Sequence, residues 1–392
     1  MKATLGQGAP PPTRTRYLVA LVLFGLFLAA LGLEMAGHLY LRYVASDERF
    51  LAYASLDQLL HRYPQPAYSP HRYLGYYPTP NYEKGPNRHN SLGYRGPEIE
   101  PKKAAGRFRI VFMGGSTVYE TAIDDYGLAS PYLLQAELRA RGYPNVEVIN
   151  AGVPNWSTWE SLISFEFRDL DLDPDLIIVY HGINDIPPRL VWPPSAYRGD
   201  NSGRRSPNTG VFTPSILERS TILRMLMIRF GLAESQARLE RTIDRSPPTF
   251  FDEEFVNQKI AGTYPRGIFH QASAMEMLKA NKPIYFRRNL ENIIAIAQHK
   301  KIKTILATFA YTSHLQTSPR VTSAEYITAF DELNSIIRLV AGEMKVNLFD
   351  FTEAFPKDGR YYTDGRHVNI EGARLKAQLF ADYIVGARLL DR

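Results

Sequence analysis

The sequence predicts an α/β protein of three layers, in which a mostly parallel sheet of five strands lies between helices. From Phe108 onward, short apolar runs alternate with segments of helical periodicity, and this alternation favours right-handed βαβ units. One of the runs, "PDLIIVYHG", is almost continuously apolar. Such a run is typical of a strand that is buried on both faces.

The predicted strands and helices follow one another in regular order, with one interruption. Strands are expected at residues 109–114, 146–152, 174–182, 303–310 and 346–351. Helices are expected at residues 130–142, 157–170, 287–301, 324–344 and from residue 370 onward. The helix at 157–170 opens with a Ser and a Thr, which are good N-caps. The order breaks between Pro187 and Pro283, which predicts an insertion in the domain.

Composition excludes several kinds of chemistry. The chain has 392 residues and no cysteine, so disulfides, thiolate nucleophiles and cysteine-based metal sites are ruled out. It has neither the P-loop pattern nor the dinucleotide fingerprint, and it has no metal-binding H-E-x-x-H motif. We therefore expect no cofactor, no metal and no nucleic-acid partner. The formal net charge is +6, which leaves an anionic glycan or lipid open as a partner.

An uncharged stretch near the N-terminus predicts a membrane anchor at residues 17–40. Its apolar part, Tyr17–Leu33, would be about 26 Å long as a helix, near the short limit for a span. Basic residues precede it, so the positive-inside rule places residues 1–16 in the cytoplasm and the rest of the chain outside. A cleaved signal peptide and a buried helix of a soluble protein are the alternatives. The run is long for a signal peptide, and Glu34 stands where a cleavage signal would form.

Two further segments flank or interrupt the predicted catalytic domain, which spans residues 106–390. Residues 41–105 are rich in Tyr and Pro and predict an extended, ordered arm. The run "NSLGYRGPE" lies within this arm, and no chemistry follows from it. The insertion, residues 187–283, has a helical, arginine-containing segment near Arg219–Arg229. It begins next to the predicted site, so a lid, a substrate platform or a lipid contact is expected there.

The insertion also carries the basic excess of the chain. Residues 189–288 hold 16 Lys and Arg against 9 Asp and Glu. This excess favours an anionic glycan or lipid head groups, although a solvated surface would have the same composition.

Four polar stretches, each following a predicted strand, hold the candidate catalytic residues. They are "GGST" with Ser116, "NAGVPNWS" with Gly152, "HGIND" with Asn184, and "TDGRHVNIEG" with Asp364 and His367. A serine nucleophile needs a His base, and the base needs a carboxylate to orient it. Ser116, His367 and Asp364 supply these groups. The N–H groups of Ser116 and Gly152 and the amide of Asn184 are expected to form the oxyanion hole.

In these four blocks the sequence resembles the SGNH or GDSL-type hydrolases. The hallmark Ser, Gly, Asn and His of that family stand here, in order, as Ser116, Gly152, Asn184 and His367. The resemblance covers about residues 107–187 and 284–388 and implies a flavodoxin-like fold and serine esterase activity. Gly115 stands where the first block of the family usually has Asp.

The expected function is hydrolysis of a small acyl ester, with acetyl favoured, on a carbohydrate or lipid of the cell envelope. The expected location is the membrane, with a single span and the catalytic domain on the extracytoplasmic side. An O-acyltransferase that uses the same triad on a glycan is the first alternative. A catalytically inactive binding module and a phosphate- or nucleotide-binding domain are the others. Taken singly, each site residue is more often a turn, cap or surface residue, so the prediction depends on their combination.

Overall fold

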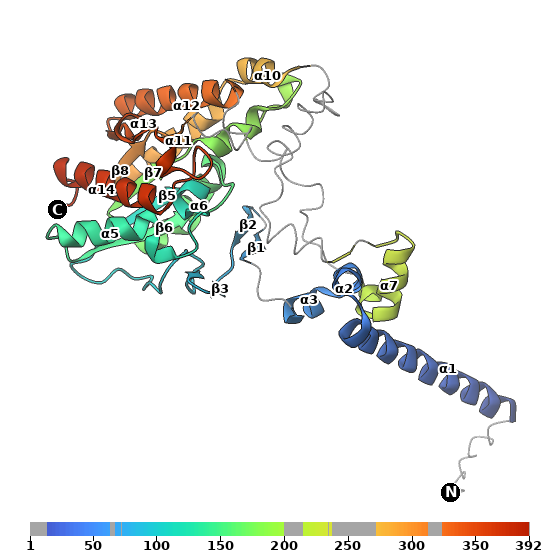
Figure 1. Cartoon of the computed structure of the whole chain (residues 1–392). Helices are drawn as coiled ribbons and strands as arrows, with labels where there is room; N and C mark the ends of the chain where they lie inside the picture. Colours follow the sequence, from blue (N-terminus) through green and yellow to red (C-terminus); the bar gives the residue numbers. More distant parts are fainter. Residues whose placement is uncertain are drawn as a thin grey trace, which may run out of the picture. The chain divides into compact units, whose positions relative to one another are not determined.

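The chain forms two compact units in a computed structural model (Figure 1). The first unit comprises residues 1–64 and 212–241, and the second comprises residues 65–211 and 242–392. The structure describes residues 14–62, 67–71, 73–199, 215–233, 235–236, 272–312 and 324–391.

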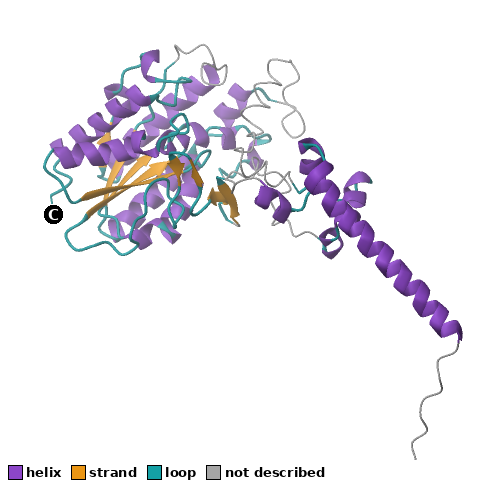
Figure 2. Cartoon of the chain, turned by 60° about the horizontal axis from the view of Figure 1, so that its bottom comes forward, coloured by secondary structure: helices purple, strands orange, loops and turns teal. Residues whose placement is uncertain are grey.

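The second unit is built on a parallel sheet in the strand order β6-β5-β7-β8-β9, as predicted. Figure 2 shows the sheet with helices on both of its faces. The strands are β5 (Phe108–Gly114), β6 (Val146–Gly152), β7 (Leu176–Tyr180), β8 (Lys303–Ala307) and β9 (Asn347–Phe349). This order is that of a flavodoxin-like fold, whose ligands bind beyond the carboxyl ends of the strands.

The register of the sheet aligns the carboxyl ends of β6, β5 and β7. Gly114 at the end of β5 pairs with Gly152 on one side and with Tyr180 on the other. Every residue of β5 and β7 is buried, because helices cover both faces of the sheet. The apolar runs of the sequence therefore form the core, and the polar residues that follow them meet at one edge.

Two helical layers enclose this sheet. Helix α5 packs against α14 on one side, whereas α11 packs against both α6 and α12 on the other. The helices are α5 (Ser130–Ala140), α6 (Thr158–Phe167), α11 (Ile284–His299), α12 (Ala324–Glu343) and α14 (Ile370–Gly386). Three shorter helices are α4 (Ser116–Tyr119), α10 (Ala274–Ala280) and α13 (Phe351–Ala354).

The segment predicted as an extended arm, residues 41–105, is divided between the two units. Its first part is helical rather than extended, with α2 (Asp47–Tyr53) and α3 (Leu56–Arg62). These helices are short and free of proline, so the prolines that argued against helix do not interrupt them. The second part forms two hairpins within the second unit. Their strands are β1 (Tyr68–His71), β2 (Gly75–Pro78), β3 (Glu83–Lys84) and β4 (Asn87–Arg88).

The first unit contains the apolar N-terminal helix α1 (Arg14–Leu39), α2, α3 and α7 (Thr221–Arg229). Together with the turn that follows it, α1 is the one helix within the described residues that is long and apolar enough to cross a membrane. Its apolar window is 0% buried. A buried helix of a soluble core, which was one alternative, does not fit this exposure.

The described centre of the insertion does not belong to the catalytic unit, whereas its described ends, residues 187–199 and 272–283, do. Residues 215–236, including α7, belong to the first unit together with α1. We therefore do not assign to them the lid or platform role that their position in the sequence suggested. Arg224, one of the three arginines of the predicted basic segment, is buried and so is not part of a basic surface. Of the 16 Lys and Arg in residues 189–288, nine lie within the described residues, against two of the nine Asp and Glu, so the basic excess falls in the described part of this segment.

The burial of His181, directly after β7, predicts how the stability of the catalytic unit depends on pH. Burial lowers the pKa of His181 to about 3. In the unfolded chain this side chain binds a proton near pH 6.5, whereas in the folded chain it stays neutral at that pH. Stability should be constant above that pH and should fall as the pH drops below it, by about 1.4 kcal/mol per pH unit. We expect the melting temperature of the full chain in detergent to decrease from pH 7 to pH 5, and to decrease less in His181→Gln.

The exposed His299 offers a matched control for this experiment. His299→Gln should retain the acid sensitivity of the wild type. Identical pH dependence in the wild type and His181→Gln would contradict the assignment. Part of the sensitivity should remain in His181→Gln, because burial also lowers the pKa of His89, to about 4.

Candidate active site

A tight turn from strand to helix places Ser116 at the carboxyl edge of the sheet. Strand β5 ends at Gly114, and α4 begins two residues later with Ser116. A Cβ atom at Gly114 would lie 2.5 Å from the carbonyl oxygen of Tyr180 and 2.4 Å from Cγ2 of Val118. Glycine is therefore required for this turn to lie so close to the end of β7. The run of two glycines before Ser116 is explained in part by this close approach.

Ser116, His367 and Asp364 form a continuous chain of hydrogen bonds. The Nε2 atom of His367 lies 2.7 Å from Oγ of Ser116, and Nδ1 lies 2.7 Å from Oδ2 of Asp364. Ser116 is 8% exposed. An ionised Asp364 accepts a hydrogen bond from Nδ1–H of His367, which leaves Nε2 as the acceptor for the serine hydroxyl. The geometry is thus that of a nucleophile, its base and the group that orients the base.

Asp364 is held in its ionised form by its own loop. Burial opposes ionisation, but the hydrogen bond and charge of His367, the charge of Arg366 and the His367 N–H outweigh it and hold the Asp364 pKa well below its usual range. Oδ1 accepts from the backbone N–H of His367 at 2.8 Å. Gly365 in this loop has a φ of 92°, and its carbonyl oxygen accepts from the N–H of Thr312 at 2.8 Å. The carboxylate is therefore fixed from several sides.

Asn184 approaches the nucleophile turn at Gly115. Its Nδ2 atom donates one hydrogen to the carbonyl oxygen of Trp156 at 2.9 Å, which leaves a second amide hydrogen for another acceptor. A Cβ atom at Gly115 would lie 2.3 Å from this Nδ2 and 3.2 Å from the Trp156 oxygen. Gly115, where the family usually has Asp, thus allows Asn184 its present position. Any side chain there would require Asn184 to move.

Gly152 has a structural position that differs from its predicted role. Its N–H donates to Oδ1 of Asn150 at 3.0 Å, and Nδ2 of Asn150 donates to the carbonyl oxygen of Val118 at 3.1 Å. A Cβ atom at Gly152 would lie 2.3 Å from the backbone nitrogen of Tyr119. Gly152 therefore packs against the back of α4 and directs its single N–H to Asn150. This geometry does not support Gly152 as an oxyanion donor.

The loop between β6 and α6 borders the nucleophile turn instead. Asn155 in this loop has a φ of 62°, in the left-handed region that favours glycine and, among other residues, asparagine. The carbonyl oxygen of the next residue, Trp156, is the one that receives the Asn184 amide. The sequence points to the stretch "NAGVPNWS" but singles out only Gly152 in it, because an Asn-Trp pair carries no catalytic signal by itself.

Asp185, next to Asn184, connects the turn after β7 to helices α6 and α11 through hydrogen bonds. Its Oδ1 accepts from the backbone N–H of Thr158 at 3.0 Å and from the hydroxyl of Thr158 at 2.6 Å. Thr158 is the first residue of α6, so the carboxylate satisfies a donor of the first helical turn and opposes the helix dipole. Nδ2 of Asn289, on α11, donates to the same hydroxyl at 3.1 Å. The turn that carries Asn184 is thereby fixed to two helices.

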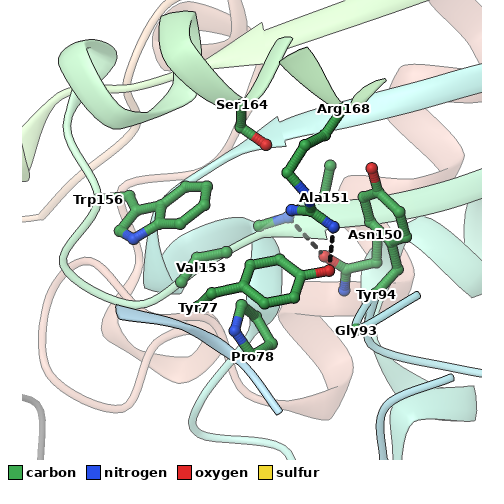
Figure 3. A pocket seen from close by; sticks show the side chains of 11 residues that line it. Tyr77, Pro78, Gly93, Tyr94, Asn150, Ala151, Val153, Trp156, Ser164 and Arg168 are labelled. Atoms are coloured by element: carbon green, nitrogen blue, oxygen red, sulfur yellow. Dashed lines mark hydrogen bonds between the residues drawn. The ribbon is translucent and has the colours of Figure 1, made fainter. Parts of the chain in front are cut away.

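A small cavity beside β6 is separate from this constellation. Figure 3 shows its lining, in which the Arg168 guanidinium lies over the ring of Tyr77, 3.7 Å from the ring centroid. Arg168 also donates to the carbonyl oxygen of Leu92 at 2.9 Å. Gly152 and Trp156 form part of the wall. None of Ser116, Asp364 and His367 lines this cavity, so we assign it no catalytic role.

A family model of GDSL-like lipases and acylhydrolases matches residues 112–375. The chain belongs to this family. It is a serine ester hydrolase, and the match includes each residue of the Ser-His-Asp chain.

Several solved structures are similar to this hydrolase. A lipase/acylhydrolase from Enterococcus faecalis is 18% identical, with a TM-score of 0.41, and the match covers 71% of this chain and 96% of that one. The acetyl xylan esterase AlAXEase is 15% identical, with a TM-score of 0.40 and coverage of 71% and 99%. An acetyl xylan esterase from Geobacillus stearothermophilus is 13% identical, with a TM-score of 0.40 and coverage of 72% and 97%. No curated protein is similar to the chain at a significant level.

A buried ion pair lies directly beneath the nucleophile turn of the hydrolase. Nζ of Lys376, on α14, donates to the carbonyl oxygen of Thr117 at 2.7 Å and contacts Oε1 of Glu120 at 3.2 Å. The Glu120 carboxylate also accepts from the N–H of Ser130 at 2.7 Å. Burial lowers the pKa of Lys376, and the charge of Glu120 partly offsets this effect. Lys376 and Glu120 thus fix the residue after Ser116 to α14 and α5.

Arg95, from the "NSLGYRGPE" run, satisfies the other end of α4. Its guanidinium donates to the carbonyl oxygens of Tyr119, Glu120, Ile123 and Asp124, the last at 2.9 Å. These are carbonyl groups at and beyond the end of the helix, which lack partners within it. Arg95 is 1% exposed. The run that had no assigned chemistry therefore positions the nucleophile turn from its far side.

The Lys376–Glu120 pair leads to a prediction about catalysis. Lys376→Met should lower kcat with little change in KM, because the Thr117 carbonyl loses its partner and Ser116 is less well positioned. It should also destabilise the catalytic unit by about 3–5 kcal/mol, since Glu120 becomes a buried unpaired charge. Steady-state kinetics on a p-nitrophenyl ester and thermal melts measure the two effects.

The double variant Lys376→Met/Glu120→Gln separates positioning from stability. Removal of the buried charge should restore most of the melting temperature, whereas kcat should stay low because the Thr117 carbonyl still lacks its donor. If kcat returns together with the melting temperature, the pair contributes to stability alone.

Proposed function

We propose that this chain is a membrane-anchored esterase that removes a small acyl group, expected to be acetyl, from a carbohydrate or lipid of the cell envelope. The observation that carries the proposal is His367, which bridges Ser116 and Asp364 with two contacts of 2.7 Å. Residues 251 positions apart in the chain meet here in hydrogen-bonding geometry, at the sheet edge where such folds bind ligands.

In the proposed reaction, Ser116 is the nucleophile and His367 the base. Nε2 takes the hydroxyl proton as Oγ attacks the acyl carbonyl carbon, and the resulting oxyanion collapses with loss of the carrier alcohol, which receives the proton from Nε2. Water, activated by the same nitrogen, then attacks the acyl-enzyme and releases the carboxylic acid and free Ser116. Asp364 stays ionised throughout and stabilises the imidazolium, in keeping with its lowered pKa.

The oxyanion would be stabilised by the backbone N–H of Ser116 and the amide of Asn184. Ser116 begins α4, and N–H groups in the first turn of a helix have no acceptor within that helix. Asn184 has one amide hydrogen beyond the one it donates to Trp156. A donor of this kind contributes roughly 10²–10³ in kcat. Gly152 is left out of this set, because Asn150 accepts its N–H.

The family match supports ester hydrolysis, and the features of α1 support the proposed location. Helix α1 exposes its apolar side chains, and the basic residues before its apolar part favour a cytoplasmic N-terminus with the catalytic unit outside. An enzyme held there would meet envelope polymers and lipids first.

The nucleophile assignment predicts selective labelling by a fluorophosphonate. The full chain in detergent should be labelled at Ser116, and Ser116→Ala should not be labelled. His367→Ala should react far more slowly, because the hydroxyl has lost its base. Ser335→Ala removes an exposed hydroxyl on α12 and should be labelled like the wild type. Equal labelling of the wild type and Ser116→Ala would reject the assignment, and no labelling of either would favour an inactive module.

The hydrolase assignment predicts that water is a sufficient acceptor. With an acetyl ester as donor, acetate should be released at the same rate with and without an added oligosaccharide. Mass spectrometry of the oligosaccharide is the second measurement, and it should show no added acetyl group. Turnover that requires the oligosaccharide and acetylates it would establish the O-acyltransferase alternative, with the same triad.

A further inference from the structure

The end of the apolar helix α1 is fixed to the start of α7 within the first unit. The carboxylate of Glu34 accepts from the hydroxyl of Ser220 at 2.7 Å and from the backbone N–H groups of Thr221 and Ile222 at 2.5 and 3.3 Å. A negative charge at this place satisfies the first turn of α7 and opposes its dipole. A Cβ atom at Gly37 would lie 2.8 Å from Cδ1 of Ile222, so the helices approach closely here.

One face of α7 is used to hold the first unit together. Arg224 is 1% exposed and donates to the carbonyl oxygens of Tyr53 and Glu218 at 2.9 and 2.7 Å, and to Oε1 of Gln58 at 3.1 Å. Met225 packs against the small core that includes Leu41 and Phe50. This face of α7 is therefore occupied by α2, α3 and the end of α1.

The opposite face of α7 is apolar and exposed. Leu223, Leu226 and Phe230 are 43%, 47% and 72% exposed, and their spacing places them on one side of the helix. The flanking residues Ile216, Leu217 and Leu232 are also exposed, at 76%, 54% and 73%. We call these six residues the α7 apolar face. Exposed apolar side chains gathered on one helix and its flanking turns mark a contact with protein or membrane.

Position and charge identify the lipid surface as the partner. Glu34 directly follows the apolar part of α1, so the bonds from Glu34 place the start of α7 where a span of Tyr17–Leu33 would leave the hydrocarbon core. The side chains of α1 nearby, such as Met35 and Leu39, are themselves exposed at 61% and 51%. Arginines on the segment, which include the exposed Arg229, add positive charge beside the α7 apolar face.

We infer that α7 and its flanking turns form an interfacial element that rests in the head-group layer of an anionic membrane, next to the anchor. The element has the features of such helices: an apolar face, basic flanks and a polar face turned to protein. The inference rests on the proposed membrane location of α1. It assigns to the described centre of the insertion a lipid contact in place of a role at the ester.

The absence of cysteine in the chain allows a direct test with single-cysteine reporters. Leu226→Cys and Phe230→Cys of the full chain are labelled with an environment-sensitive nitrobenzoxadiazole dye. The proteins are reconstituted in vesicles of phosphatidylcholine and phosphatidylglycerol. Both reporters should lose fluorescence to brominated lipids and should be protected from aqueous iodide. Both positions are exposed, so circular dichroism should show unchanged folding.

Two matched reporters make the outcomes distinct. Phe24→Cys in α1 reports on the anchor, and Phe167→Cys, at a position 73% exposed in the catalytic unit, reports on solvent. Quenching of Leu226→Cys and Phe230→Cys by iodide, as for Phe167→Cys, overturns the inference even if Phe24→Cys lies in lipid. Protection from both quenchers also overturns it and indicates a protein partner. If Phe24→Cys is not quenched by lipid, the proposed anchor fails, and the α7 reporters are judged by their own quenching.

The charge component is tested separately. Arg219→Gln/Arg229→Gln should reduce the lipid quenching of the Phe230→Cys reporter in vesicles that contain phosphatidylglycerol. The same change should have little effect in vesicles of phosphatidylcholine alone. An equal effect in both vesicles would remove the anionic lipid from the inference and leave the apolar contact.

Discussion

The parallel register of β5 with its two neighbours is the constraint on which the site depends. It brings Gly114, Gly152 and Tyr180 to the same level at one edge of the sheet. Each strand then continues into a turn, and these turns are packed so closely that a Cβ atom at either glycine would collide with backbone. The nucleophile turn, the Asn184 turn and the β6–α6 loop can therefore surround one small volume.

Three buried charged side chains hold the turns at this edge of the sheet in place. Lys376 and Arg95 bind carbonyl oxygens of α4 and of the turn after it, and Asp185 binds the first turn of α6. In a low-dielectric interior such groups stay only if they are paired or hydrogen-bonded. Lys376 is paired with Glu120, and Arg95 and Asp185 are hydrogen-bonded to backbone groups. The turns that carry Ser116 and Asn184 are thus held by buried polar side chains, and these side chains form their hydrogen bonds within the catalytic unit. Sub-ångström placement of a nucleophile is attributable to such support.

Sequence patterns were sufficient for the fold, and they named the three residues of the proposed Ser-His-Asp triad, which are hydrogen-bonded in the structure. The apolar runs predicted the strands, and the carboxyl ends of parallel strands lie at one edge of a sheet. Polar residues just beyond these ends were therefore expected to lie close together, which is why Ser116, His367 and Asp364 could be proposed from the sequence. Lys376 and Glu120 could not be, because they are ordinary helix and turn residues whose partners are distant in sequence. Gly152 had the right residue type and position, but Asn150, two residues earlier, accepts its N–H. Which acceptor an N–H meets depends on packing, which the sequence pattern does not encode.

The insertion is a second feature whose packing partner could not be predicted from the sequence pattern. It begins just after the turn of Asn184, which suggested a role at the site. Its described centre instead belongs with α1, because Ser220 binds Glu34 of α1 and Arg224 binds the carbonyl oxygen of Tyr53, and no local sequence pattern predicts these bonds. The length and charge of this segment predicted an insertion, but they did not predict which part of the chain it packs against.

The way the chain passes between the two units has a consequence for proteolytic release of the catalytic unit from the proposed anchor. The chain passes between the units three times, after residues 64, 211 and 241. A protease that cut the first passage would separate α1 from the catalytic unit covalently. The segment 212–241 would still be attached to that unit and would still hold α1 through Glu34. Release of the catalytic unit would then require both a cut in the chain and dissociation of α7 from α1. A single cut in the first passage would leave the catalytic unit bound to α1.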